Sequence, residues 1–206
     1  MKNTAAYVVL VLCACLLSAE KSATKILVVY YSPAGHTAAM AASIAAGAVS
    51  VEGVVVALET VESVGLNQVL EADAIIIGSP VLNANVAPEV QKFINGWPIE
   101  ETPLRNKVGA AFATGGGISA GEEAVQFSIL RSMLIFGMVV VGGPEWTSPF
   151  GASAITEEAP FDPRDGKQLV AEMFLRKGRD LGKRVAELAL HWKQNAASDE
   201  TQRAKP

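Results

Sequence analysis

Two hydroxyl side chains and a glycine lie close together where an apolar run ends. Ser32, Gly35 and Thr37 belong to the segment SPAGHT, which follows the apolar run Ile26–Tyr31. The hydroxyls can donate hydrogen bonds to an anion, and the glycine lets the backbone approach a ligand closely. If a helix begins directly after the glycine, its free N–H groups add roughly half a positive charge. These residues therefore predict a loop that binds a phosphate monoester.

Two other kinds of phosphate loop do not fit this segment. A Walker loop needs Gly-Lys-Ser/Thr after four intervening residues, and a dinucleotide fingerprint needs three glycines as G-x-G-x-x-G. The segment from Ser32 to Thr37 has neither pattern, which argues against ATP, GTP and an NAD bound as in a Rossmann fold. One alternative stays open at this point, namely an ordinary strand-to-helix turn that Thr37 caps.

Strand-like and helix-like segments alternate along the chain. The strand-like segments are 26–31, 54–58, 73–80, 107–113 and 138–141, and the helix-like ones are 36–48, 67–71, 87–95, 122–136 and a C-terminal helix. Unbroken apolar strands that alternate with helices are typical of a parallel sheet covered on both faces. The pattern predicts a doubly wound five-stranded parallel sheet in three α/β/α layers, with strand order 2-1-3-4-5.

Three loops follow the carboxyl ends of the first, third and fourth predicted strands. They are Ser32–Thr37, Pro80–Val86 and the glycine-rich Thr114–Gly121. In a sheet with this strand order, these ends meet at the switch point, where ligands of open α/β sheets bind. We therefore expect one crevice formed by all three loops.

Length and composition favour one compact domain. The chain has 206 residues, of which 50% are hydrophobic and 18% charged, with a net charge of −4. We assign the domain to residues 25–195 and a polar tail to 196–206. No basic cluster points to a nucleic-acid surface, so nucleic acid is not an expected partner.

The N-terminus has the order of a secretory signal. Lys2 precedes an apolar run from Ala5 to Leu17, and small residues follow. We expect a leader over residues 1–19, and hence an exported protein; a lipoprotein leader with Cys15 lipidated is the alternative, and this leader is the only expected membrane contact. Because Cys13 and Cys15 both lie in the leader, the mature chain would have no disulfide and no Cys-ligated metal, and no metal site is predicted.

Several segments, in order, resemble the flavodoxin-like NAD(P)H:quinone oxidoreductases of the WrbA type. They are YYSPAGHT, ADAIIIGSP with Asn85, AFATGGG with the following GEE, FGMVVVGGP, SPFGAS and GKRVAELA. The similarity extends from Lys25 to the C-terminal helix. It implies a flavodoxin-like fold, an FMN cofactor, NAD(P)H as electron donor and a quinone or similar small acceptor.

The resemblance also implies which residues hold FMN. The phosphate would bind to the first loop, and the isoalloxazine ring would lie between the second and third loops, where glycines permit close approach. Hydride transfer through flavin N5 needs no side-chain nucleophile, so no catalytic residue is assigned. The implied cofactor-binding residues are Ser32, Pro33, Ala34, Gly35, His36, Thr37, Pro80, Val81, Leu82, Asn83, Asn85, Thr114, Gly115, Gly116, Gly117, Ile118 and Ser119.

Other features of the family are carried over less directly. Trp97 is the candidate for a substrate-side tryptophan, although a tryptophan before Pro98 also suits packing at a helix end. The family implies a homo-oligomer, a dimer or tetramer, and the segment from Gly142 to Arg164 could serve its interface. The carboxylates Glu122 and Glu123 are interpreted as structural, since they would complement the dipole of a helix start.

The sequence departs from the family at two places near the expected flavin. The family pattern Thr-Arg-Phe-Gly is Val81-Leu82-Asn83-Ala84 here, and a paired histidine is replaced by Ile135-Phe136. A cation, an aromatic ring and an imidazole are therefore missing. Two alternatives to the quinone oxidoreductase follow: a one-electron carrier of flavodoxin type, or a non-catalytic protein of the same fold with weak or lost FMN binding.

Overall fold

The computed structural model describes residues 23–163 and 168–203. The predicted leader, residues 1–19, lies outside them. The elements are β1 (Thr24–Tyr30), α2 (His36–Val49), β2 (Val54–Thr60), α3 (Leu66–Glu71), β3 (Ala74–Leu82), β4 (Asn85–Val86), α4 (Pro88–Asn95), β5 (Val108–Gly115), α5 (Glu122–Ile135), β6 (Val139–Val140), β7 (Ala152–Ile155) and α6 (Glu172–Arg203).

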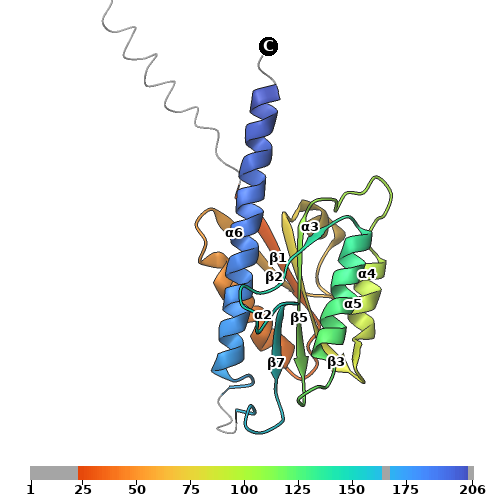
Figure 1. The fold of residues 1–206 in the computed structure, drawn as a ribbon. Helices are drawn as coiled ribbons and strands as arrows, with labels where there is room; N and C mark the ends of the chain where they lie inside the picture. The colour runs from red at the N-terminus through yellow and green to blue at the C-terminus, as the bar shows by residue number, and fades with distance from the viewer. Residues whose placement is uncertain (1–22, 164–167, 204–206) are drawn as a thin grey trace, which may run out of the picture.

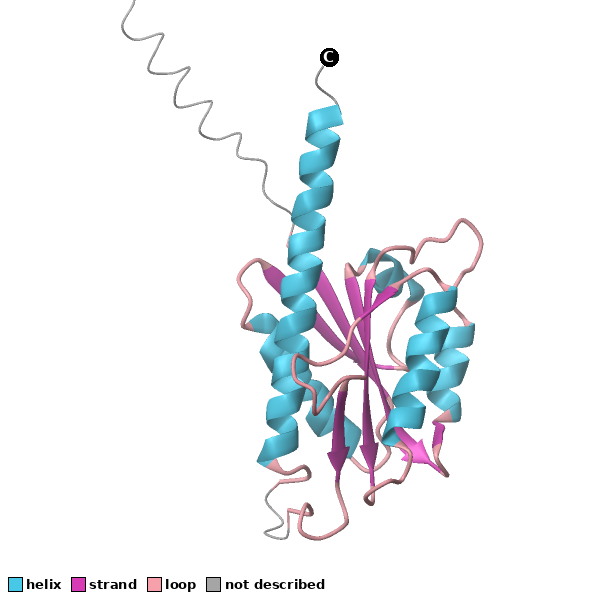
Figure 2. Cartoon of the chain, viewed as in Figure 1, coloured by secondary structure: helices cyan, strands magenta, loops and turns pink. Residues whose placement is uncertain are grey.

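The parallel sheet has the predicted order. Its strands run β2-β1-β3-β5-β6, which is order 2-1-3-4-5 when these five strands are renumbered along the chain. Figure 1 shows α2 and α6 on one face of this sheet and α4 and α5 on the other. Figure 2 shows the same three layers by type of element. The doubly wound α/β/α fold is therefore confirmed.

Alternate residues of the central strands enter two separate cores. Ile26 and Val28 of β1 pack in the core under α2 and α6, whereas Leu27 and Val29 pack in the core under α4 and α5. All four side chains are essentially inaccessible to solvent. Because neighbouring side chains of a strand point to opposite faces, an unbroken apolar strand fills both cores.

Helices α2 and α6 pack with their backbones in close contact. A β-carbon built at Gly47 would lie 2.0 Å from the carbonyl oxygen of Arg179, and one built at Gly182 would lie 1.9 Å from that of Ile44. Each helix therefore presents a glycine to the other's backbone. This contact fixes α2, the helix that begins at the first loop, against the sheet.

The fifth position of the sheet is shared by two short strands. β6 pairs with the start of β5 through Val139 and Val140, and β7 pairs with its end, where Ala152 lies opposite Phe112. The prediction of a single strand over 138–141 missed β7. Part of the segment 142–164, which could serve an interface, returns to the sheet edge as β7.

The loops are shorter than predicted. Thr114 and Gly115 belong to β5, and β3 continues to Leu82. The predicted loop Pro80–Val86 is instead a hairpin in which Asn85–Val86 forms β4 and pairs with the end of β3. Only Asn83 and Ala84 form its turn.

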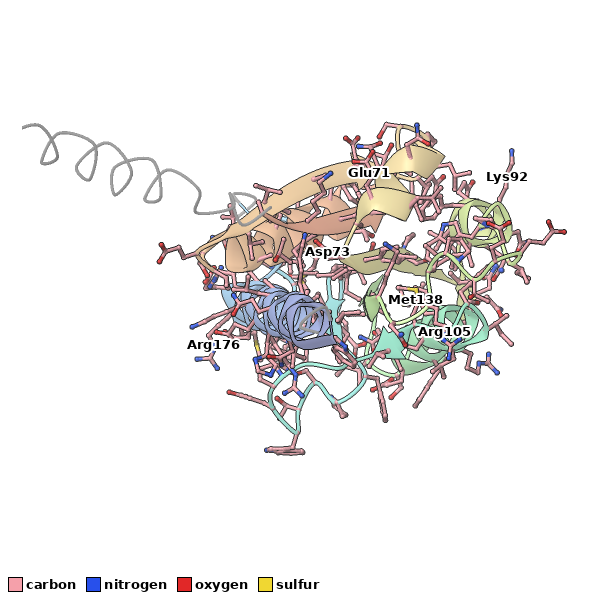
Figure 3. All side chains as sticks on the ribbon, turned by 90° about the horizontal axis from the view of Figure 1, so that it is seen from above. Glu71, Asp73, Lys92, Arg105, Met138 and Arg176 are labelled. Atoms are coloured by element: carbon pink, nitrogen blue, oxygen red, sulfur yellow. The ribbon has the colours of Figure 1, made fainter. Side chains whose placement is uncertain are left out.

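The opposite end of the sheet is held by charged side chains. Lys193 Nζ of α6 lies 2.8 Å from Asp73 Oδ2, and the backbone N–H of Lys25 donates to the same oxygen at 2.8 Å. Figure 3 looks down on this end and shows Asp73 beside α6. Lys107 donates to the carbonyl oxygens of Leu70 and Ala72, and burial lowers the pKa of its ammonium group. These contacts close the end of the sheet that lies away from the three loops.

Helix α6 extends through the predicted polar tail as far as Arg203. None of the helices in the described part of the chain is both long enough and apolar enough to cross a membrane.

Candidate functional site

A pocket of about 160 Å³ lies at the carboxyl ends of β1, β3 and β5, where all three loops meet. It is smaller than the roughly 300–1,000 Å³ of a typical whole-ligand site, so it suits one end of a ligand. The structure brings together Ser32, Pro33, Ala34, His36, Thr37, Pro80, Val81, Leu82, Thr114, Gly115 and Gly116 of the predicted residues, and adds Thr156 and Glu157.

The first loop is built as an anion-binding turn. Gly35 adopts the left-handed conformation, with φ of 86°, directly before α2. Ser32 Oγ accepts the N–H of Ala38 at 3.0 Å, so the hydroxyl of Ser32, and not that of Thr37, supports the helix start. The first turn of a helix leaves N–H groups without intrahelical partners. The loop therefore presents N–H and O–H donors to the pocket.

A buried hydrogen bond joins the first loop to the end of β5. The hydroxyls of Thr37 and Thr114 lie 2.8 Å apart, and both residues are almost fully buried. In a buried site, removing either partner of such a bond lowers stability, because the other hydroxyl is left without a hydrogen bond. The pair therefore fixes the distance between the first and third loops.

The second loop is held at its base and strained at its tip. Ser79 Oγ accepts the N–H of Ala87 at 2.9 Å and donates to the carbonyl oxygen of Pro80 at 2.7 Å. At the tip, Asn83 and Ala84 have φ of 51° and 62°. Asn83 and Asn85 were predicted to bind the cofactor, but they lie in the hairpin, outside the pocket lining, where the amide of Asn85 donates to the carbonyl oxygen of Asn83 at 2.8 Å.

The third loop is held by the segment that follows β7. The N–H of Thr156 donates to the carbonyl oxygen of Gly115 at 2.9 Å, and the N–H of Glu157 donates to that of Gly116 at 3.0 Å. Both residues line the pocket, and sequence reasoning missed them. The segment SPFGAS, which resembles the family, overlaps the start of β7, but a strand of four residues gives little periodicity by which to find it.

The remaining predicted residues of the third loop lie beyond the pocket lining. They are Gly117, Ile118 and Ser119. The N–H of Ile118 donates to Glu158 Oε2 at 2.6 Å. The side chain of Ile118 is 52% exposed. Leu82 on the second loop is also exposed, at 38%. Apolar side chains are thus available on both loops between which the ring was predicted to lie.

The pocket contains little positive charge. Among the described residues that line it there is no lysine and no arginine. Partial burial and the neighbouring Glu89 carboxylate raise the pKa of Tyr31, the residue directly before the first loop. Its phenol therefore stays neutral at pH 7 and contributes no charge to the site.

Trp97 does not lie in this pocket. It is 5% exposed and packs edge-on against Phe93 and Phe136, with ring centroids 5.5 Å and 5.3 Å away. These contacts join the C-terminal ends of α4 and α5, whereas the pocket lies at the N-terminal ends of both helices. The structure thus supports the packing role and not the substrate-side position.

The donor set suits FMN at its phosphate end. The first loop offers hydroxyls and backbone N–H groups to a phosphate monoester, and the bare backbone of Gly115 and Gly116 lets a ligand approach the third loop closely. A metal ion is not favoured by the described residues, which contain no group of three or more His, Cys, Asp or Glu side chains placed to hold one.

Comparison with known proteins agrees with this geometry. Residues 59–153 match the family model "NADPH-dependent FMN reductase". NAD(P)H dehydrogenase (quinone) 3 of Rhizobium meliloti is 34% identical over 200 residues, covering 81% of this chain and 92% of that protein. NAD(P)H dehydrogenase (quinone) of Azorhizobium caulinodans is 31% identical over 193 residues, covering 80% and 96%.

Two further matches concern flavodoxins. A flavodoxin of Aquifex aeolicus is 32% identical over 173 residues, covering 79% of this chain and 85% of that protein. The crystal structure of a flavodoxin, WrbA-like protein from Agrobacterium tumefaciens matches with a TM-score of 0.68 at 21% identity, covering 82% of this chain and 99% of the other. That likeness shows the fold. Together with the pairwise matches, it shows that the chain belongs to the flavodoxin-like NAD(P)H dehydrogenase (quinone) family.

Proposed function

We propose that the protein binds FMN and uses it to transfer two electrons from NAD(P)H to a quinone or a similar small acceptor. The observation that carries the proposal is the pocket at the switch point of the sheet, with hydrogen-bond donors at one end and glycines at the other. The relatives named NAD(P)H dehydrogenase (quinone) support the same activity.

Different residues of the pocket would contact different parts of the cofactor. Ser32, Thr37 and the first turn of α2 would hold the phosphate, while Val81 and Leu82 would border the ring on the second loop. FMN supplies the hydride chemistry when bound. The protein's part is to orient the ring, admit each substrate in turn and limit water, which requires no side-chain nucleophile.

The visible spectrum of the purified protein after FMN addition tests the first step. We expect a bound-flavin spectrum that survives gel filtration, followed by NADH or NADPH oxidation that depends on added 1,4-benzoquinone. Because both substrates would react in turn with the same flavin, double-reciprocal plots of initial rate against nucleotide concentration at several quinone concentrations should be parallel, as in a ping-pong mechanism. Failure to retain FMN, or retention without turnover with either nucleotide, would reject the proposal.

A one-electron carrier is the second candidate, and the flavodoxin relative favours it. The pocket argues against it, because no aromatic side chain lies among the described residues that line it. The carrier would be supported if NAD(P)H does not reduce the flavin and a stable one-electron-reduced flavin accumulates during a redox titration. Reduction in a single two-electron step would support the oxidoreductase.

A further inference from the structure

Each of three consecutive glycines in the third loop faces a carboxylate. A β-carbon built at Gly115 would lie 2.4 Å from Glu122 Oε1, and one built at Gly116 would lie 3.2 Å from Glu157 Oε2. At Gly117, the nearest atom would be Glu158 Oε2, at 2.8 Å. These three side chains, Glu122, Glu157 and Glu158, are called the carboxylate shell below.

The shell comes from two separate parts of the chain. Glu122 opens α5, whereas Glu157 and Glu158 follow β7. Glu157 lines the pocket directly. Glu158 accepts the N–H of Ile118, which fixes its carboxylate against the loop. The strand β7 therefore brings acidic groups to the loop from the far side of the sheet edge.

Glu122 is the buried member, and one of its oxygens has no partner. The residue is 5% exposed, and Oε2 accepts the N–H of Gly121 at 3.1 Å. Oε1 finds no hydrogen-bond partner among the described residues and points toward Gly115, which lines the pocket. A buried oxygen without a partner is costly. Glu122 itself does not line the pocket, so it acts on an occupant through the field of its charge behind Gly115 and not through a direct hydrogen bond.

No cation among the described lining residues offsets the shell. Like charges at separations of a few ångströms repel measurably even in water, and more strongly where the surroundings are less polar. A phosphate bound at the first loop would add negative charge of the same sign. Any molecule that approaches the ring end of the pocket therefore meets a negative field.

We propose that the carboxylate shell makes the protein discriminate against anionic electron acceptors, so that neutral and cationic quinone-type molecules react in preference. This proposal rests on the proposed function, because it concerns the acceptor that reaches the same pocket. It assigns a specificity role to Glu157 in the pocket lining, to Glu158 beside Gly117, and to Glu122 behind Gly115.

The test compares one acceptor ring in two charge states. FMN-loaded protein is reduced chemically and mixed in a stopped-flow instrument with 1,4-naphthoquinone or with its 2-sulfonate. The ratio of the two rate constants is compared between wild type and the variants Glu157→Gln, Glu158→Gln and Glu122→Gln. Comparing ratios between variants cancels the intrinsic difference in reactivity of the two quinones.

The matched control is Glu123→Gln. Glu123 is next to Glu122 on α5 and is exposed, so its substitution makes the same change in net charge without touching the glycines. We expect each shell variant to shift the ratio toward the sulfonate by about threefold to tenfold, and the control to leave it unchanged. The shift should shrink in 1 M salt, where the Debye length falls to about 3 Å.

Each outcome decides the proposal. The proposal is overturned if the shell variants leave the ratio of the two rate constants unchanged. It is also overturned if Glu123→Gln shifts the ratio as much as the shell variants do. Bound FMN without NAD(P)H turnover would reject the proposed function, while the chemically reduced flavin would still test the shell. Absence of FMN binding by the wild-type protein would overturn both.

Discussion

The two ends of the pocket use different means to accommodate a ligand. At the first loop, neutral donors surround the space: the Ser32 and Thr37 hydroxyls and the N–H groups at the start of α2. At the third loop, bare glycine backbone is backed by carboxylates. A phosphate can thus be recognised by hydrogen-bond geometry without a cation, while the other end selects by repulsion.

The backbones of the two ends differ as well. The first loop places a glycine, Gly35, at its left-handed position, where glycine has no steric penalty. On the ring side, Gly121 also has positive φ, but left-handed positions are in addition occupied by Asn83, Ala84 and Ser119. Left-handed conformations cost non-glycine residues about 1–2 kcal/mol. The end of the pocket at the first loop, where the phosphate would bind (the phosphate end), is therefore free of this backbone strain. The end at the second and third loops, where the ring would lie (the ring end), is strained.

The largest expected effect is loss of FMN binding in Gly35→Asp. The substitution puts a side chain at φ of 86°, where a β-carbon would lie 2.9 Å from Leu169 Cδ1, and adds a negative charge beside the phosphate site. We expect the affinity for FMN to fall at least 100-fold, or about 2.7 kcal/mol, in isothermal titration calorimetry. Val81→Ala, on the opposite side of the pocket, is the control and should change it less than about threefold. Equal affinities for the two variants would show that the phosphate does not bind at the first loop.

The next effect concerns the bond that joins the two ends. We expect Thr37→Val and Thr114→Val each to lower the free energy of unfolding by about 1–2 kcal/mol, because each leaves one buried hydroxyl without its partner. The double variant should cost clearly less than the sum, since it leaves no orphan. Urea unfolding of the four proteins gives the coupling energy. Strict additivity would mean that the two hydroxyls do not interact.

Sequence reasoning found the first end of the pocket more completely than the second. The first loop is continuous in sequence, and its strand, glycine and helix carry local signals that predict their positions. The ring end is assembled from distant segments. Glu157 reaches it only because β7 returns to pair with β5, and a strand of four residues such as Ala152–Ile155 has little periodicity to detect.

The second loop was misjudged for a related reason. Asn83 and Asn85 were assigned to the cofactor by resemblance, although Asn83 is also a favoured residue at a left-handed turn position. Alanine is a poor turn former, so Asn83-Ala84 gives a weaker turn signal than Asn-Gly would. For Trp97 the sequence left packing at a helix end as an alternative, and the structure favours it, because α4 runs away from the pocket and Trp97 follows the end of that helix.

A smaller effect should follow from returning a cation to the ring end in Leu82→Arg. Leu82 lines the pocket and is partly exposed, so an arginine there can keep contact with water. A nearby positive charge favours a negatively charged reduced flavin by about 1 kcal/mol. We expect tighter FMN binding and a rise in the two-electron reduction potential of about 20–30 mV, measured by dye-coupled redox titration. The control Leu82→Gln adds a long polar side chain without charge and should leave the potential near wild type. A potential that is unchanged or lower in Leu82→Arg, with FMN bound, would place the ring away from the second loop.

The smallest expected effect is a gain in stability from Ala84→Gly, and it tests the strain at the ring end directly. Ala84 has φ of 62°. Its β-carbon lies close to Gly121 of the third loop, because a β-carbon built on Gly121 would be 3.0 Å from it. Glycine removes the steric cost of this conformation, but it also gives the unfolded chain more freedom. The difference should leave a net stabilisation of about 0.5–1 kcal/mol, read as a higher urea midpoint with an unchanged slope.

The same change at Ala42, an exposed position inside α2, should destabilise by a similar amount, because a helix interior needs no left-handed residue. If both glycine variants lower the midpoint, Ala84 carries no strain, and the contrast between the relaxed phosphate end and the strained ring end is wrong.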